Sequence, residues 1–182
     1  MSIAPRPSWW ALSDSGWCVR ANRAGGRPGV RRYFTVVSRL GDGAFWYALM
    51  SVLVVADGAD GLAASAQMAA TGAVALVLYK RLKRWTKRPR PFAADGRIRA
   101  WAAPLDEFSF PSGHTLHAVS FTVVALSHYP VLAWLLLPFT ASVALSRVVL
   151  GLHYPSDVLA ATAIGGLLAA TSIQLAALPP FA

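Results

Sequence analysis

SRVVLGLHYPSD, residues 146–157, joins two apolar segments of this 182-residue chain. Arg147 ends an uncharged apolar run, where burying an ionisable side chain is costly, so it is a candidate for function. His153 and Asp157 follow, four residues apart, and Pro155 between them favours the start of a helix. We expect Asp157 to accept the Nδ1 proton of His153 and to leave Nε2 free as a nucleophile. Alternatively, Asp157 only caps a helix, while His153 and Arg147 lie at a membrane surface.

The composition is that of a membrane protein. Hydrophobic residues make up 55% of the chain, charged residues only 14%, and the mean hydropathy is +0.47. Of the 17 Lys and Arg residues, seven precede residue 40 and nine lie between Lys80 and Arg99. Basic clusters that flank apolar spans are typical of the cytoplasmic ends of membrane helices. This placement argues against nucleic-acid binding, which the net charge of +9 would otherwise suggest.

Five apolar spans predict an all-α integral membrane bundle. Their bounds are residues 44–56, 62–79, 115–129, 131–145 and 158–178. About 20 apolar residues cross a bilayer core, so the shorter spans need tilt or protein neighbours. The first span is expected to begin earlier, near Tyr33, with a distortion at Gly41-Asp42-Gly43. In the last span, Ala161, Gly165 and Ala169 have the four-residue spacing that lets helices approach closely, and a generic content of small residues is the alternative.

The first forty residues differ from the rest of the chain. Trp and Arg residues alternate there, and both types favour the headgroup zone of a membrane. We therefore expect residues 1–40 to form a basic interfacial segment and residues 41–182 to form the membrane-embedded domain. A partly disordered tail is the alternative. The N-terminus lacks the continuous apolar core of a signal peptide.

A long polar loop, residues 80–111, leads into the third span and is where function is expected. It ends at Pro111-Ser112-Gly113-His114. Backbone N–H groups at a helix N-terminus bind anions, and Gly113 lets the backbone come close to a ligand. Ser112 adds a hydroxyl donor, and His114 is suited to general acid catalysis near neutral pH. The simpler interpretation is a helix-start signal.

The same loop begins with a run of cations whose functional members cannot be chosen from spacing alone. The run comprises Lys80, Arg81, Lys83, Arg84, Lys87, Arg88 and Arg90. Together with the two motifs above, however, it completes a pattern. K-x6-R-P from Lys83, P-S-G-H from Pro111 and S-R-x5-H-x3-D from Ser146 resemble the three-part signature of the type-2 phosphatidic acid phosphatase superfamily. Vanadium-dependent haloperoxidases, which look soluble and much larger, and bacterial acid phosphatases share it.

The resemblance implies a membrane lipid phosphatase that works through a phosphohistidine. His153 would attack phosphorus, Asp157 would orient it, and His114 would protonate the leaving oxygen. The phosphoryl oxygens would be bound by Lys83, Arg90, Ser112, Gly113 and Arg147. No cofactor and no metal is expected, because Asp157 alone among the eight acidic residues lies in a motif and no carboxylate cluster suits Mg²⁺.

The expected substrate is a phosphomonoester or pyrophosphate on a lipid. Phosphatidylglycerol phosphate, phosphatidic acid and prenyl-linked phosphates such as undecaprenyl pyrophosphate all fit. One alternative is a phosphotransferase that uses the same phosphohistidine. Another is a non-enzymatic protein that binds anionic lipid, although binding needs cations and no nucleophile. The sequence leaves the oligomeric state open.

The number of spans bears on which membrane face carries the site. Many membrane members of the superfamily resemble six-helix proteins, so the first helix is absent here, is replaced by residues 1–40, or makes a sixth. With five spans, the two basic segments and the 146–157 stretch share one side, which their charge makes cytoplasmic. We expect a bacterial inner-membrane protein with a cytoplasmic site. A periplasmic site is the alternative.

Overall fold

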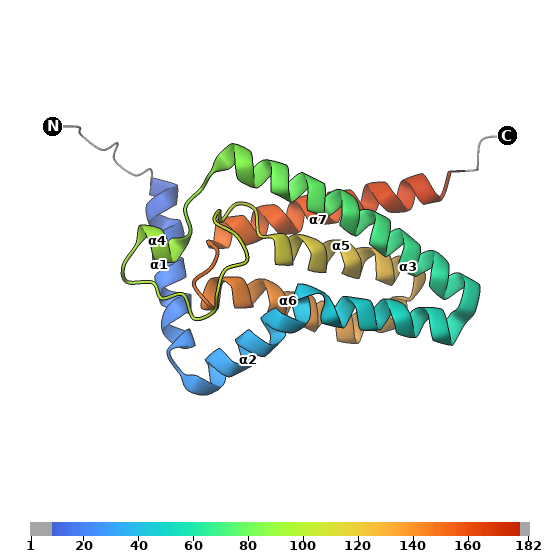
Figure 1. Ribbon diagram of the computed structural model, residues 1–182, viewed down its shortest axis with the longest axis horizontal. Helices are drawn as coiled ribbons and strands as arrows, with labels where there is room; N and C mark the ends of the chain where they lie inside the picture. The colour runs from blue at the N-terminus through green and yellow to red at the C-terminus, as the bar shows by residue number, and fades with distance from the viewer. Residues whose placement is uncertain (1–8, 179–182) are drawn as a thin grey trace.

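The computed structural model describes residues 9–178, and all regular elements in that range are helical (Figure 1). The all-α fold predicted from the sequence is confirmed. The elements are α1 (Trp9–Gly25), α2 (Pro28–Arg39), the π-helical turn η1 (Leu40–Ala44), α3 (Phe45–Thr86), α4 (Pro91–Ala94), α5 (Gly113–His128), the 3-10 turn η2 (Pro130–Leu132), α6 (Ala133–Val149) and α7 (Pro155–Ala176).

Helix α3 folds back on itself. Asp57 and Gly58 leave the helical conformation, and the φ of Gly58, 52°, lies in the left-handed region that favours glycine. The bend divides α3 into a first arm, residues 45–56, and a second arm, residues 59–86, which Figure 1 shows returning toward α1. Ser65 Oγ donates a hydrogen bond of 3.0 Å to the carbonyl of Met50 across the bend.

The helices correspond to the predicted spans. The first two spans are the arms of α3, and the others are α5, η2 with α6, and α7. The expected distortion at residues 41–43 is the π-helical turn η1, which α2 enters directly. Three helical stretches are long and apolar enough to cross a membrane: Pro28–Ala94, which contains the bend, Pro130–Val149 and Pro155–Ala176. Helix α5 has 16 residues.

Helix α5 lies among α3, α6 and α7 and packs against all three. On α7, the small residues Ala161, Gly165 and Ala169 are buried. A Cβ on Gly165 would come within 2.7 Å of the carbonyl oxygen of Leu116, so α5 and α7 need a glycine there. Ser120 Oγ donates to the Gly165 carbonyl at 3.2 Å. This is the close approach that the four-residue spacing predicted.

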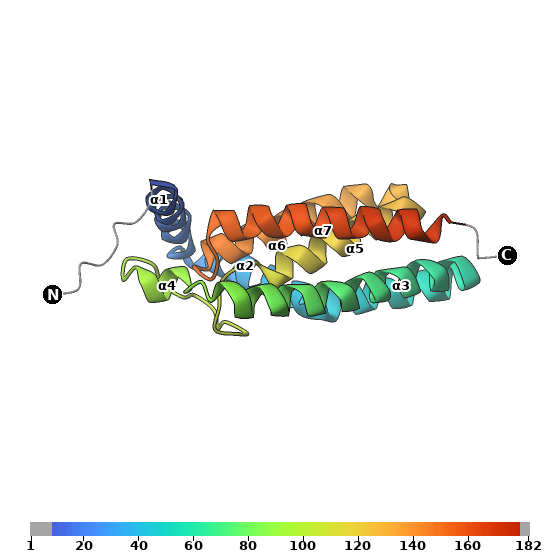
Figure 2. The ribbon, with the colours of Figure 1, turned by 90° about the horizontal axis from the view of Figure 1, so that it is seen from above.

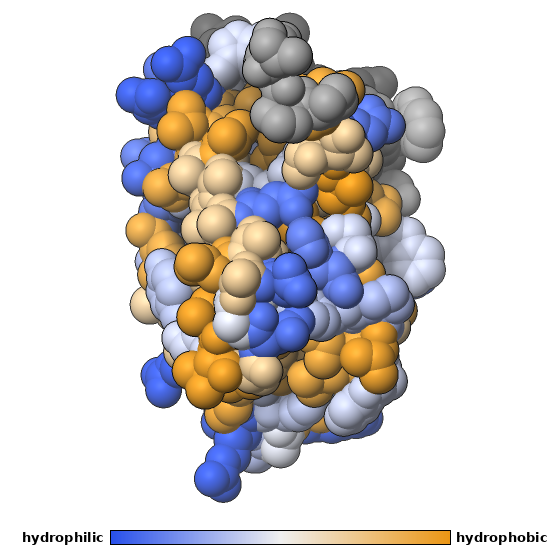
Figure 3. Space-filling model, turned by 90° about the vertical axis from the view of Figure 1, so that its right-hand side faces the viewer, coloured by the Kyte–Doolittle hydropathy of each residue, from blue (hydrophilic) through white to orange (hydrophobic). Residues whose placement is uncertain are grey.

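The two ends of the bundle are polar, while its sides expose apolar side chains. Figure 3 looks onto the end opposite α1 and shows hydrophilic residues gathered among hydrophobic ones. There Tyr129 donates to Asp57 at 2.7 Å, and the His128 ring pairs with the Gln67 side chain at 2.7 Å. Polar ends and apolar sides suit a bundle that crosses a bilayer.

Helix α1 lies across the other end of the bundle. Figure 1 shows it perpendicular to the long helices, and Figure 2 shows it end-on. Asn22 Nδ2 donates to the carbonyls of Arg99 and Val149 at 2.9 and 3.0 Å. Helix α1 is thus attached to the loops on that side. The interfacial role of residues 1–40 stays a prediction, and residues 1–8 lie outside the described part of the chain.

Candidate active site

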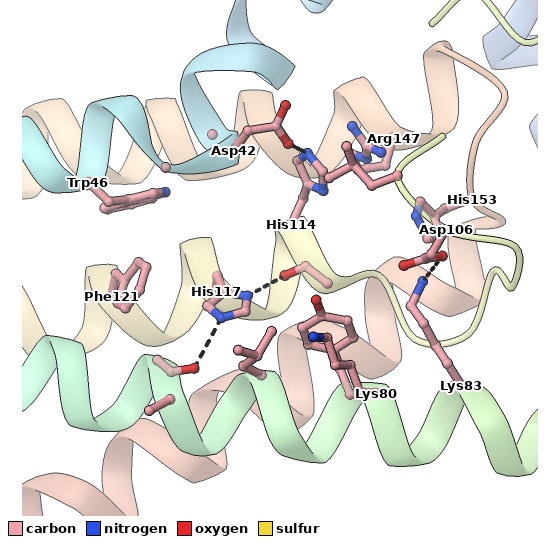
Figure 4. A pocket seen from close by; sticks show the side chains of 18 of the residues that line it. Asp42, Trp46, Lys80, Lys83, Asp106, His114, His117, Phe121, Arg147 and His153 are labelled. Atoms are coloured by element: carbon pink, nitrogen blue, oxygen red, sulfur yellow. Dashed lines mark hydrogen bonds and ion pairs between the residues drawn. The ribbon is translucent and has the colours of Figure 1, made fainter. Parts of the chain in front are cut away.

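A cavity of about 880 Å³ lies between the two arms of α3 and the start of α5, a size typical of small-molecule sites. Figure 4 shows side chains from the long loop, α5 and the α6–α7 connection pointing into it. Six residues of the sequence motifs line this cavity: Lys83, Arg90, Gly113, His114, Arg147 and His153. The three motifs are therefore brought together from positions up to seventy residues apart.

His153 lies in the short connection between α6 and α7 and is 2% exposed. Its Nδ1 is 2.6 Å from the carbonyl oxygen of Ser109, which can only accept a hydrogen bond, so Nδ1 carries the proton. Nε2 is therefore unprotonated and accepts a hydrogen bond of 3.3 Å from Nη1 of Arg90. Burial, followed by the positive charges of Arg147 and Arg90, lowers the pKa of His153 well below its ordinary value. The imidazole is thus neutral at physiological pH.

Asp157 differs from the expectation in one detail. Its carboxylate lies 3.6 Å from Nδ1 of His153, so the hydrogen bond predicted between them is made instead by the closer Ser109 carbonyl. Oδ2 of Asp157 accepts from the backbone N–H of Tyr154 at 2.8 Å and caps α7, and Oδ1 accepts from Arg88 at 2.7 Å. These contacts match the alternative interpretation, in which Asp157 caps a helix.

Three buried cations surround the nucleophilic face of His153: Lys83, Arg90 and Arg147 are 5%, 3% and 2% exposed. Lys83 Nζ and Arg90 Nη2 converge on Oδ1 of Asp106 at 2.8 and 2.7 Å. Burial raises the pKa of Asp106, but the hydrogen bond and charge of Lys83, with those of Arg90, outweigh it and lower the pKa overall. The carboxylate oxygen bridges the two cations as a phosphoryl oxygen would.

Two residues of the first membrane segment also reach the site. Arg147 Nη1 donates to Ser38 Oγ of α2, while Arg147 Nε has no partner among residues 9–178. The Nε2 atom of His114 is paired with the carboxylate of Asp42 in η1 (Figure 4). The motifs contain neither residue, so sequence reasoning missed Ser38 and Asp42. The distortion expected at residues 41–43 was the one available signal.

Ser112 is not among the residues that line the cavity, and its contacts cap α5. Its Oγ accepts from the backbone N–H of Thr115 at 3.4 Å and pairs with the Thr115 hydroxyl at 3.0 Å, which caps α5. Its own N–H donates to the Asp157 carbonyl oxygen at 3.3 Å. Ser112 therefore connects the second motif to the third, while Gly113 and His114 face the cavity.

Sequence reasoning also missed Asp106 and Arg88. Asp106 carries no motif signal, although two buried cations require a nearby anion. Arg88 belongs to the basic run and pairs with both Asp157 and Asp14, at 2.7 and 2.6 Å. Among the described residues, no group of three or more His, Cys, Asp or Glu side chains is placed to hold a metal ion.

The site contains a neutral histidine whose unprotonated Nε2 faces buried cations, and it lies at one end of a bundle of apolar helices. These features define a phosphoryl-transfer site in a membrane protein. The PAP2 superfamily model matches residues 61–178, and the chain belongs to this superfamily. It is an integral membrane phosphatase that hydrolyses lipid phosphates.

Relatives cover most of the chain. It is 35% identical over 162 residues to decaprenylphosphoryl-5-phosphoribose phosphatase of Mycolicibacterium smegmatis, covering 87% of this chain and 83% of that protein. The crystal structure of Aquifex aeolicus LpxE superposes with a TM-score of 0.76 at 25% identity, over 87% of this chain and 93% of that one. The PAP2-type phosphatidylglycerolphosphate phosphatase of Bacillus subtilis superposes with a TM-score of 0.71 at 25% identity, over 94% and 88%.

Proposed function

We propose that this protein hydrolyses a phosphate group on a membrane lipid through a phosphohistidine at His153, without a metal ion. The observation that carries the proposal is the state of that side chain. The Ser109 carbonyl holds the proton on Nδ1, so the Nε2 lone pair faces Arg90 and the cavity. A neutral imidazole with a fixed tautomer is a nucleophile, and the adjacent cations attract the phosphate to it.

In the first step, Nε2 of His153 attacks phosphorus and the bond to the leaving oxygen breaks. His114 gives a proton to that oxygen through its own Nε2. Lys83, Arg90 and Arg147 bind the non-bridging oxygens and stabilise the charge that builds up on them, which is usually the largest catalytic contribution. The phosphoryl group takes the place of the Asp106 carboxylate between Lys83 and Arg90.

In the second step, water attacks the phosphohistidine. His114, now neutral, accepts a proton from the water, and the bond from phosphorus to His153 breaks. Inorganic phosphate leaves, and His114 is again protonated for the next cycle. Asp157 takes part indirectly, because it fixes the start of α7 and lies 3.6 Å behind the His153 ring. Ser112 contributes in the same way through the cap of α5.

The cavity supports a lipid substrate. Its charged part carries the cations and histidines, and apolar side chains of both arms of α3 and of α5 continue it, among them Trp46, Met50, Leu76 and Phe121. A lipid phosphate would place its phosphate group in the charged part of the cavity and its acyl or prenyl tail in the apolar part. The M. smegmatis relative, by its name, acts on a prenyl-linked sugar phosphate. Phosphatidic acid, phosphatidylglycerol phosphate and prenyl-linked phosphates are the substrates to test.

For the topology, we propose five membrane crossings, made by α2 with the first arm, the second arm, α5, α6 and α7. The site, α1 and both basic clusters then share the cytoplasmic face. Cys18 is fully buried, so labelling needs introduced cysteines. In a Cys18→Ala background, Gly96→Cys is expected to react only with a membrane-permeant maleimide, and Asp60→Cys, at the other end, also with an impermeant one. The reverse pattern would place the site outside.

Phosphate release by the purified full-length protein, with EDTA present, tests the activity. The panel contains phosphatidic acid, phosphatidylglycerol phosphate, diacylglycerol pyrophosphate and undecaprenyl pyrophosphate. We expect turnover of at least one lipid in EDTA, and its loss in His153→Ala. Activity that disappears in EDTA and returns with Mg²⁺ would contradict the metal-free mechanism. Phosphohistidine that breaks down only when an acceptor alcohol is added would indicate a transferase.

A further inference from the structure

Asp42 reaches the site because of an irregular turn in the first membrane segment. It lies in η1, where the helix widens to a π-helical turn and Gly43 adopts a φ of 142°, in the region that favours glycine. Such single π-helical turns occur frequently at functional sites. Gly41 next to it is buried against α6, where a Cβ would come within 3.0 Å of a methyl group of Val143. The turn is therefore seated closely on α6.

The atom that Asp42 contacts is the one the mechanism uses. Its carboxylate pairs with Nε2 of His114, which transfers the proton to the leaving oxygen. The His114 side chain is 9% exposed and that of Asp42 is 37% exposed, so the carboxylate is the more accessible member of this pair in the cavity lining. Burial and then the charge of Arg147, which lines the same cavity, disfavour the protonated form of His114. The negative charge of Asp42 opposes that effect.

We propose that Asp42 is a positioning residue that favours the protonated form of His114 and makes the site selective for lipid phosphomonoesters over lipid pyrophosphates. The proposal rests on the function proposed above. It deepens that function by naming which of the two substrate classes the site prefers. Among the residues of the three motifs, the general acid His114 is the one whose task differs between the two classes, and Asp42 contacts it directly.

The two classes differ in what leaves. From a phosphomonoester, the oxygen departs as an alkoxide that must receive the proton of His114 Nε2 to become an alcohol, so a protonated His114 is needed. From a pyrophosphate, the group that departs is a lipid phosphate, whose second pKa is about 6, so it leaves as an anion without that proton. Asp42 helps the first reaction through His114, and its charge repels the second leaving group.

A matched pair of substrates isolates this difference. Phosphatidic acid and diacylglycerol pyrophosphate carry the same tails and differ in the leaving group. With the pyrophosphate labelled at its terminal phosphate, kcat and KM are measured for wild type, Asp42→Asn and Asp42→Glu in EDTA. Asp60→Asn is the control, because Asp60 is an exposed acid beside the Asp57-Gly58 bend of α3, at the opposite end of the bundle. Size-exclusion elution and thermal unfolding establish that each variant is folded.

We expect Asp42→Asn to lower kcat for phosphatidic acid at least about tenfold, a part of the 100-fold or more that a general acid contributes. Terminal phosphate release from the pyrophosphate is expected to be unchanged or faster, so the ratio of the two kcat values falls by about tenfold or more. Asp42→Glu restores part of the ratio, and Asp60→Asn leaves it at the wild-type value.

An equal loss on both substrates would overturn the proposal, because Asp42 would then only support the fold. So would an unchanged ratio in Asp42→Asn, or a wild-type preference for the pyrophosphate. His153→Ala separates this result from a failure of the proposed function. If that variant retains turnover of both lipids, the phosphohistidine mechanism itself is wrong, whatever Asp42 does.

Discussion

His153 and His114 face the same cavity, but different kinds of partner hold them. The backbone carbonyl of Ser109 fixes Nδ1 of His153, and the surrounding cations disfavour a second proton on that ring. His114 instead has the carboxylate of Asp42 at its Nε2. A carbonyl selects a tautomer, whereas a carboxylate favours a cation. The two environments therefore suit opposite tasks: attack for His153 and proton donation for His114.

The largest effect is expected when each histidine is removed in turn. His153→Ala should lower turnover of a lipid phosphomonoester at least about 1,000-fold, because the nucleophile is lost. His114→Ala should cost about 100-fold, the contribution of a general acid. A nitrophenolate leaving group needs no proton in the first step, so the initial burst of nitrophenolate should be restored in His114→Ala and stay absent in His153→Ala. Rescue of both variants, or of neither, would contradict the division of tasks.

The control for both variants is His128→Ala. His128 lies at the opposite end of the bundle and contacts Gln67. Its replacement should leave turnover of either substrate at the wild-type value, which separates a loss of chemistry from a general effect of histidine replacement.

Protonation of His153 should abolish its nucleophilic attack at low pH. Burial, then the charges of Arg147, Arg90 and Lys83, lowers its pKa well below the ordinary 6.5. The protonated ring cannot attack, so the acid limb of kcat/KM that belongs to His153 should lie below pH 6.5. Nitrogen NMR of histidine-labelled protein, assigned by difference from His153→Ala, should show a neutral ring with the proton on Nδ1 at pH 6.5. An imidazolium signal for His153 there would refute this.

Asp106→Asn should strengthen substrate binding by a moderate factor, whereas the histidine variants lower turnover. The Asp106 carboxylate occupies Lys83 and Arg90, which a substrate phosphate must take over. Without the negative charge, we expect KM for the lipid and the inhibition constant of orthovanadate to fall about tenfold or more, since a charge-assisted hydrogen bond contributes about 1.5–3 kcal/mol. Asp95→Asn, on the same loop but paired with the exposed Arg97, is the control. A rise in both constants would show that Asp106 mainly positions the cations.

The smallest effect is expected from Ser38→Ala. Ser38 accepts a hydrogen bond from the buried Arg147 and lies outside the cavity lining. Its loss should lower kcat/KM about two- to tenfold, as for a typical net hydrogen bond of about 0.5–1.5 kcal/mol. The variant Ser142→Ala, which removes the partner of Tyr33 at 2.9 Å in an exposed position, should have no effect. A Ser38→Ala enzyme with wild-type kcat/KM would mean that Arg147 needs no support from α2.

Much of the fold could be predicted, because apolar length and glycine content report directly on helices and their interruptions. The distortion at Gly41-Asp42-Gly43 and the close packing of Gly165 on α5 both follow from sequence. Contacts between distant segments could not be predicted in this way. Asp42 and Asp106 are ordinary acidic residues in the sequence, and only the folded chain brings them to His114 and Lys83.

The roles expected for Ser112 and Asp157 show another limit of sequence reasoning. A residue in a functional motif can act by holding the backbone of its neighbours. Ser112 caps α5 and Asp157 caps α7, and the two are connected through a backbone hydrogen bond of 3.3 Å. The sequence could not distinguish such a cap from a direct ligand, because both use the same side chains in the same spacing.

The most direct test of the account is to trap the covalent intermediate. The full-length protein is mixed with phosphatidic acid labelled with ³²P, quenched within milliseconds in alkali, where phosphohistidine is stable, and digested for mass spectrometry. We expect an acid-labile phosphate on His153 in wild type, less of it in His114→Ala because the first step lacks its general acid, and none in His153→Ala. A phosphate on any other residue, or wild-type turnover without a covalent label, would contradict the phosphohistidine mechanism.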